Sequence, residues 1–429
     1  MVLVAVALVV AAHWYVWRRL VRDTTKPRGL ARRLGTAAAV LLPLLAIGAV
    51  SSGRSGAPFW SQQVMAWPGF LWLAVLIYLL LALLVGEAVR PLLLRPLKNR
   101  QPAETQSQSQ TQTQTQPQAG TQTRTPADAV IPAGTSVKPA SATTAETPSV
   151  PAATSPSRRL FVSRVVGGAA ATAALATVGY GTYGVLRGPQ VKRLTIPLAK
   201  LPRAAHGFRI AVVSDIHLGP ILGRAHTQRI VDTINSTQPD LIAVVGDLVD
   251  GSVENLGPAA EPLSGLRAPH GSFFVTGNHE YFSGAAAWVD HVRELGLHPL
   301  ENERVEIAGF DLAGVNDVAG ESEGSGPDFA KALGDRDRSR TSVLLAHQPI
   351  VIDDAVRQGV DLQLSGHTHG GQLWPGNLIA GLANPTVAGL ERYGDTQLYV
   401  SRGAGAWGPP VRVGAPSDIT IVELASRQA

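Results

Sequence analysis

Five short apolar runs in the second half of the chain are each followed at once by residues that can bind a metal ion. The first, residues 210–213, leads directly into Ser-Asp-Ile-His, and the others also end at an Asp, an Asn or a His. Runs of this length and β-branched content are typical of buried strands. A single Asp-x-His is common by chance, but five strand ends of this kind predict one shared site. The candidate ligands are Asp215, His217, Asp247, Asn278, His347, His367 and His369.

The spacing within the first motif gives a local expectation about its backbone. Asp215 and His217 lie two residues apart, and alternate residues of an extended segment share one face. An extended backbone would therefore point both side chains toward one ion. The 429-residue chain contains no cysteine, so nitrogen and oxygen donors must hold any metal.

The first 100 residues contain three apolar runs, at 2–17, 34–50 and 70–85, which we interpret as membrane spans. Each is near the short limit for a span, but none keeps the polar face of a soluble core helix. The basic residues between the first two runs predict a cytoplasmic loop, with the N-terminus and residues 51–69 outside. This topology explains the net charge of +5 better than nucleic-acid binding does, and we expect no nucleic-acid partner.

Residues 101–157 form a Gln/Thr tract that shades into Ala, Pro, Ser and Thr, a composition typical of a disordered linker. Residues 158–188 then begin with Arg158-Arg159 and continue into an apolar run. Two interpretations fit the arginines: a twin-arginine export signal, or the positive flank of a fourth span. Either one delivers the rest of the chain to the extracytoplasmic side of the cell membrane.

Residues 194–424 alternate short apolar strands with helical stretches, which predicts an α/β domain. This part resembles the calcineurin-like metallophosphoesterases of the bacterial membrane-anchored branch. The resemblance rests on Ser-Asp-Ile-His-Leu-Gly, Gly-Asp-Leu-Val-Asp-Gly, Gly-Asn-His-Glu-Tyr and Gly-His-Thr-His-Gly-Gly-Gln. It implies a sandwich of two mixed β-sheets flanked by helices, here preceded by about four transmembrane helices.

The resemblance also implies a role for each motif residue. Two divalent ions are expected, one held by Asp215, His217 and His369, the other by Asn278, His347 and His367, with Asp247 between them. Nitrogen and oxygen donors of this kind suit Mn, Zn or Fe. His279 is implied to be the catalytic acid, oriented by Asp250. From the sequence, Asp250 is equally well a turn residue before Gly251.

These roles predict a hydrolase that attacks a phosphomonoester, phosphodiester or pyrophosphate bond with metal-bound hydroxide. Membrane anchoring favours a lipid-linked or cell-envelope substrate, for example one of the UDP-diacylglucosamine type. The alternative is a non-catalytic sensor that binds a phosphate ligand on the same fold. The complete ligand set argues against that alternative, and a transporter is disfavoured because the spans carry few internal charges.

Overall fold

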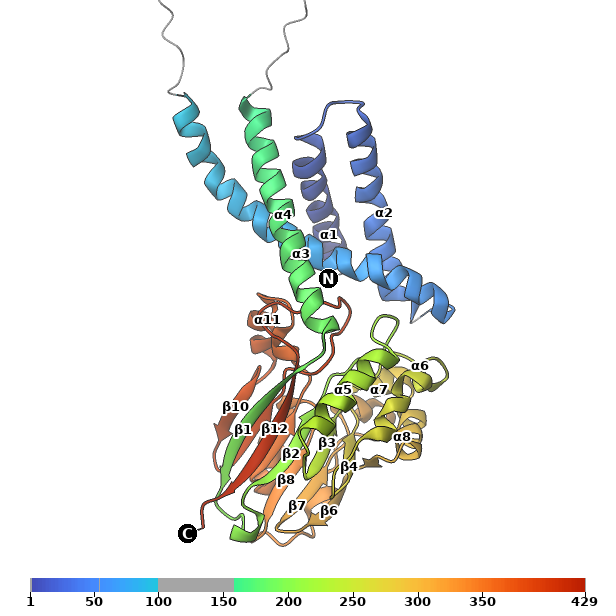
Figure 1. Cartoon of the computed structure of the whole chain (residues 1–429), viewed down its shortest axis with the longest axis vertical. Helices are drawn as coiled ribbons and strands as arrows, with labels where there is room; N and C mark the ends of the chain where they lie inside the picture. Colours follow the sequence, from blue (N-terminus) through green and yellow to red (C-terminus); the bar gives the residue numbers. More distant parts are fainter. Residues whose placement is uncertain (1, 54, 99–157, 429) are drawn as a thin grey trace, which may run out of the picture.

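The computed structural model describes residues 2–53, 55–98 and 158–428. The predicted linker, residues 101–157, lies outside this part of the chain. The described residues form a set of long apolar helices followed by a two-sheet domain (Figure 1).

The helical region contains α1 (Val2–Trp17), α2 (Leu30–Ser52), α3 (Phe59–Lys98) and α4 (Arg158–Leu186), with a short π-helical turn, Arg18–Arg22, after α1. Three stretches within the described residues are long and apolar enough to cross a membrane: Leu30–Ser52, Phe59–Pro91 and Leu160–Leu186. Helix α1 has 16 residues, or about 24 Å at 1.5 Å per residue, against a hydrocarbon core of about 30 Å. The first predicted span, residues 2–17, forms a helix, but its role as a span is not confirmed.

A group of charged residues marks one end of these helices. Arg19 forms ion pairs with Asp23 at 3.2 Å and with Glu87 at 2.9 Å, and Arg90 lies 3.6 Å from the same Glu87 carboxylate. Arg164, near the start of α4, donates to the carbonyl of Thr24. We call these charged residues the basic end. The connection between α1 and α2 lies at the end of the helices remote from the β-sheets (Figure 1).

The C-terminal domain contains two six-stranded mixed sheets. The first has the order β1-β12-β2-β3-β4-β5 and the second β10-β11-β9-β8-β7-β6. The strands of the first are β1 (Gln190–Leu198), β2 (Phe208–Val213), β3 (Leu241–Val245), β4 (Ser272–Val275), β5 (His298–Pro299) and β12 (Asp418–Ser426). Those of the second are β6 (Glu303–Ile307), β7 (Phe310–Gly314), β8 (Thr341–Leu345), β9 (Leu362–Ser365), β10 (Gly389–Tyr393) and β11 (Thr396–Val400). The predicted double-sheet α/β fold is confirmed.

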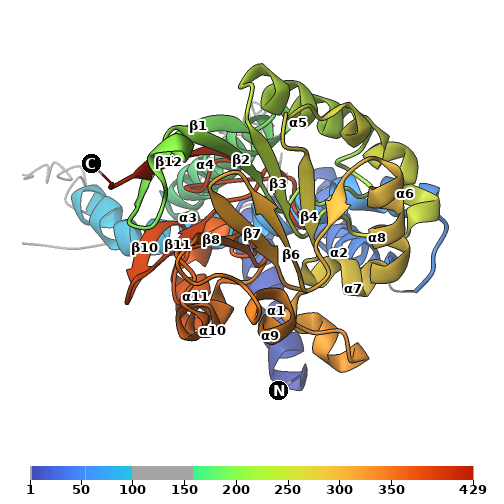
Figure 2. The same ribbon diagram turned by 90° about the horizontal axis from the view of Figure 1, so that it is seen from below.

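The sheets pack face to face because each contributes one apolar face to a shared core. Ile210 and Leu241 of the first sheet meet Leu312 and Leu345 of the second in this core, and all four are fully buried. Helices cover the outer faces (Figure 2): α5 (Arg224–Ser236), α6 (Val253–Ala260) and α8 (Ala285–Glu294) on the first sheet, α9 (Phe329–Leu333) and α10 (Ile352–Gln358) on the second. Strands buried on both sides read as continuous apolar runs, which explains the sequence pattern.

Strand direction positions the candidate ligands. Strands β2, β3 and β4 run parallel in one sheet, and β7, β8, β9 and β11 run parallel in the other. The loops that leave parallel strands emerge at the same edge, so motifs far apart in the chain meet there. Two further helices begin near this edge: α7 (Asn278–Ser283) and α11 (Gly376–Ala383).

Candidate metal centre

All seven candidate ligands lie in the loops directly after strands. Asp215 and His217 follow β2, Asp247 follows β3, Asn278 starts α7 after β4, His347 follows β8, and His367 and His369 follow β9. The local backbone differs from the extended geometry expected for Asp215 and His217, whose φ angles are 51° and 50°. Asp247, His367 and His369 also have positive φ. Non-glycine residues rarely adopt this region, and such strain clusters at functional sites where the surrounding structure fixes it.

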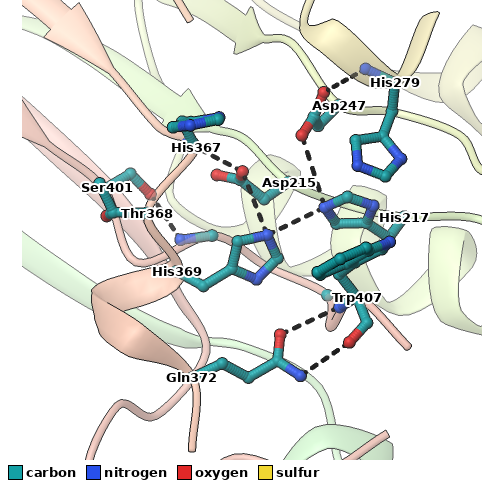
Figure 3. Close-up of polar contacts among 12 residues, drawn as sticks. Asp215, His217, Asp247, His279, His367, Thr368, His369, Gln372, Ser401 and Trp407 are labelled. Carbon is teal, nitrogen blue, oxygen red and sulfur yellow. Dashed lines mark hydrogen bonds and ion pairs between the residues drawn. The ribbon is translucent and has the colours of Figure 1, made fainter. Parts of the chain in front are cut away.

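The first group of ligands, which we call the first half, is Asp215, His217 and His369. The Nε2 atoms of His217 and His369 lie 2.9 Å apart, and His369 Nε2 is 3.4 Å from Asp215 Oδ1 (Figure 3). Asp215 Oδ1 also accepts the backbone N–H of His367. Asp215 Oδ2 is buried without a hydrogen-bond partner among the described residues. One ligand atom from each residue converges on one point, as a metal site requires.

The second half consists of Asn278, His347 and His367. His347 Nδ1 donates to the carbonyl of Val245 at 2.9 Å, which leaves Nε2 of a neutral ring as the free ligand atom. His367 Nδ1 lies 3.0 Å from Asn278 Oδ1. Backbone and amide groups therefore orient this half, and no charged side chain is involved in these two contacts.

Asp247 lies between the two halves. Its Oδ2 atom is 3.1 Å from His347 Nε2 and 3.7 Å from His217 Nε2. Its Oδ1 atom accepts the backbone N–H of His279 at 2.9 Å (Figure 3). A carboxylate in this position can contact ions in both halves.

Asp250 joins His217 to the predicted acid. Its Oδ1 atom lies 2.9 Å from His217 Nδ1 and 2.7 Å from His279 Nδ1. Burial opposes ionisation of Asp250, but the neighbouring histidines lower its pKa to about 2. The interpretation of Asp250 as an orienting residue gains support over its interpretation as a simple turn residue. The sequence did not indicate that it would hold His217 as well.

The ring of His279 lies at the rim of the site. Its side chain is 15% exposed, and its ring centroid is 4.8 Å from that of His217. Phe282 and Trp407 contact it edge-on at 5.5 and 5.7 Å. His279 therefore lies beside two exposed aromatic residues, where a ligand that enters from solvent would meet its ring.

Sequence reasoning missed two buried residues that hold the ligand loops. Glu280 accepts the backbone N–H groups of Asp247, Leu248 and Gly277. Glu280 is the third residue of α7 and accepts the N–H of the N-cap residue Gly277, which is the half of a capping box that a glycine N-cap allows. Arg412 donates to His369 Nδ1 at 3.1 Å, and no local pattern around it indicates this role.

The electrostatics of the cluster fit a cation. Burial lowers the pKa of His217, but the carboxylates of Asp250, Asp247 and Asp215 outweigh it and raise that pKa to about 9. The pKa of His347 is likewise raised well above its usual value, chiefly by Asp247 against the opposing effect of burial. Without a metal, therefore, these carboxylates favour the protonated forms of His217 and His347. Burial and the neighbouring cationic side chains instead lower the pKa of His367 to about 4 and that of His369 well below its usual value. A divalent ion would replace the protons on His217 and His347, since metal binding to histidine releases them.

Comparison with known proteins shows that this chain is similar to metallophosphoesterases. A family model described as calcineurin-like phosphoesterase matches residues 208–371, which include every candidate site residue named from the motifs. A Helicobacter pylori protein named an uncharacterized metallophosphoesterase is 40% identical over 256 residues, covering 58% of this chain and 68% of that protein. An Aquifex aeolicus protein with the same description is 36% identical over 243 residues, covering 56% of this chain and 92% of that protein.

A vertebrate relative also carries a membrane description. The Danio rerio protein named "Transmembrane protein with metallophosphoesterase domain" is 39% identical over 267 residues. The match covers 59% of this chain and 61% of the zebrafish protein. The chain therefore spans less than two thirds of that relative.

Proposed function

Because the chain belongs to the calcineurin-like phosphoesterase family, we propose that it is a membrane-anchored hydrolase of phosphoric esters that uses two divalent ions. The observation that carries this proposal is the position of Asp247, whose carboxylate lies within reach of histidines from both halves of the site. A site for a single ion would need no such shared ligand.

The residues would divide between the ions as follows. Asp215, His217 and His369 would hold one ion, Asn278, His347 and His367 the other, and Asp247 both. The nitrogen and oxygen donors suit Mn, Zn or Fe, and no thiolate is available. When bound, such ions polarise phosphoryl oxygens and lower the pKa of a water molecule.

His279 would supply the proton that the leaving group needs. Asp250 accepts a hydrogen bond from Nδ1 of a protonated His279, so the transferable proton is on Nε2. The same carboxylate holds His217 through Nδ1. Asp250 thus orients the acid and a metal ligand together.

The substrate class is a phosphomonoester, phosphodiester or pyrophosphate, and we favour one attached to a lipid or to the cell envelope. Support comes from the short path between the site and the membrane helices. Trp407 contacts the ring of His279, and a Cβ at the next residue, Gly408, would meet the ring of Phe70 in α3.

The direct test is an assay of the purified full-length chain against a panel of aryl, alkyl and lipid phosphoesters. After chelation and reloading, we expect hydrolysis with Mn, Zn or Fe and none without metal. Metal analysis of the active protein should give two ions per chain. The variant His270→Ala is a matched control, because His270 is exposed and lies outside the site. A result of at most one ion per active chain would contradict the two-ion site.

We also propose that the domain lies on the extracytoplasmic side. The basic end of the helices is remote from the sheets, and basic flanks favour the cytoplasm. A reporter fused after Gly188 should be active outside the cytoplasm, and one fused within residues 101–157 should be active inside. Opposite signals would overturn this topology.

The role of Arg158 and Arg159 needs a separate experiment. If they form a twin-arginine signal, replacing both with lysine should block delivery of the domain, whereas a plain basic flank should tolerate the change. Normal export of the double-lysine variant would exclude the signal.

A further inference from the structure

A 21-residue segment beside the metal centre, residues 370–390, contains no charged side chain. It includes α11, and none of the residues of this helix is buried. Leu378, Ile379 and Leu382 of α11 are 66%, 71% and 89% exposed, and Trp374 just before the helix is 53% exposed. Surface helices normally bury one apolar face and carry charges on the other, so an uncharged and exposed helix indicates an apolar surface that is covered in the native setting.

The segment touches the membrane-spanning helices. The hydroxyl of Tyr78 in α3 donates to the carbonyl of Trp374 at 3.0 Å, two residues before α11 begins. Nearby, the backbone N–H of Arg412 donates to the carbonyl of Gly181 in α4. Figure 1 shows α11 beside the end of α4, at the top of the β-sheet domain.

The positions of these contacts along α3 and α4 give their depth in the bilayer. Tyr78 is 12 residues from Arg90 of the basic end, or about 18 Å along α3, and its long side chain extends further. Gly181 is 17 residues from Arg164, or about 26 Å along α4. Because the hydrocarbon core is about 30 Å thick, the Gly181 contact lies about 4 Å inside its boundary on the domain side. The backbone of Tyr78 lies about 12 Å inside that boundary, and its side chain extends from there toward the domain. This is the level at which an interfacial helix is found.

We propose that α11 and Trp374 insert into the outer leaflet of the membrane and form a lipid-contacting surface next to the metal centre. The occupant is phospholipid, because the surface is continuous with spans that lipid already surrounds, and because the segment offers no charge for a polar partner. Insertion of this kind buries an apolar face about 5–10 Å into the boundary between headgroups and acyl chains. It does not depend on phosphoesterase activity.

The inserted surface is connected to the catalytic residues by short contacts. Gln372 forms two hydrogen bonds with the backbone of Trp407, as donor at 2.9 Å and as acceptor at 3.0 Å (Figure 3). Trp407 is 56% exposed and contacts the His279 ring. The aromatic rim of the site therefore faces the leaflet, so that a headgroup phosphate could reach the ligands without its lipid leaving the membrane.

Because the chain contains no cysteine, a thiol-reactive label attaches only to the one cysteine that each variant introduces. Leu382→Cys, Leu378→Cys and, as matched control, Asp395→Cys are each labelled with an environment-sensitive fluorophore in the full-length protein. Asp395 is fully exposed in the β10–β11 turn, at the opposite end of β11 from the site. The labelled proteins are placed in phosphatidylcholine vesicles with and without lipids that carry a nitroxide near the top of the acyl chain.

We expect blue-shifted emission and nitroxide quenching at Leu382 and Leu378, and neither at Asp395. Quenching at Leu382 no greater than at Asp395 would overturn the proposal. A blue shift without nitroxide quenching, together with disulfide-linked dimers of the unlabelled Leu382→Cys protein, would show that a second copy covers α11 and would also overturn it. Equal gel-filtration profiles for the three variants show that each is folded.

Discussion

The two halves of the metal centre contain the same number of ligands, but different groups hold them in place. In the first half, Asp250 fixes His217 and Arg412 contacts His369, so charged side chains orient both imidazoles. In the second half, the carbonyl of Val245 fixes His347, and Asn278 and His367 contact each other. A backbone carbonyl cannot be removed by substitution, whereas a carboxylate can.

Charge substitutions should therefore affect the two halves differently. A change at Asp250 should affect the first half and the acid His279, and leave the second half with its ligands. A change at Asp247 should affect both halves, because its carboxylate lies between them.

The largest effect is expected for Asp247→Asn. The substitution removes the negative charge within reach of His217 and His347, so both ions should bind more weakly. Loss of an outer-shell partner already costs about 10- to 100-fold in affinity or activity, and loss of a shared ligand should exceed this range. The metal content of the protein and its rate of hydrolysis of an aryl phosphoester should fall together. Retention of one ion at full occupancy would show that Asp247 serves one half alone.

His279→Ala should remove activity without removing metal. Loss of a general acid costs about 10²- to 10⁴-fold, and His279 is assigned to neither ion. The loss should be smaller for a nitrophenyl ester, whose leaving group is a stable anion, and larger for an alkyl ester that needs a proton. Equal losses for the two esters, or a loss of metal, would show that His279 is a ligand or a structural residue.

Asp250→Asn should separate the halves most clearly. Since the carboxylate orients His217 and His279, we expect a loss of activity of about 10- to 100-fold and weaker binding of one ion. The second ion should remain, because no ligand of the second half contacts Asp250 among the described hydrogen bonds and ion pairs. Titration of metal into the chelated protein, with two affinities fitted, measures the binding of each ion separately.

A matched control exists for the Asp250 variant. Asp311 is buried and forms a 2.9 Å ion pair with Arg340, but it lies in β7, outside the metal groups. Asp311→Asn should lower stability and leave both metal affinities unchanged. If the two aspartate variants bind metal equally well, the contacts of Asp250 have no role in the first half.

The sequence located the strand ends that bring the candidate ligands together because the relevant signals are local. An apolar run that ends in Asp-x-His or Gly-Asn-His marks both the strand and the start of the loop. The sequence pattern could not predict the left-handed backbone of Asp215 and His217, because that conformation depends on packing against loops from other strands. Gly405 shows this dependence, since it packs directly on the backbone of Ile216.

Contacts between distant segments explain the other misses. Arg412 reaches His369 from a loop 43 residues away, and no motif near it indicates a metal site. In the membrane region, hydropathy located the apolar centre of α3 at residues 70–85, whereas the helix extends over Phe59–Lys98. Polar or aromatic residues continue a helix beyond its apolar part without changing the hydropathy signal that identified it.

The smallest effect is expected for Glu280→Gln, which acts mainly on the loop of the shared ligand. Glu280 is fully buried, and its carboxylate accepts the N–H groups of Asp247, Leu248 and Gly277. A glutamine keeps one acceptor oxygen and turns an NH₂ group toward a backbone donor, so at least one buried N–H loses its partner. That loss costs about 1–3 kcal/mol, which should appear as a lower melting temperature of the metal-loaded protein.

The matched control for this variant is Glu294→Gln. The side chain of Glu294 is 76% exposed on α8, and a surface change of this kind stays within about 0.5 kcal/mol. Metal titration of Glu280→Gln should show small losses in both affinities, because the contacts of Glu280 reach the loop of Asp247 and the Gly277 N–H beside Asn278, and no ligand of the first half alone. A loss of metal affinity confined to the first half would mean that Glu280 acts through Asp250 and His217. In that case the two halves would not be coupled by the position of Asp247 between them.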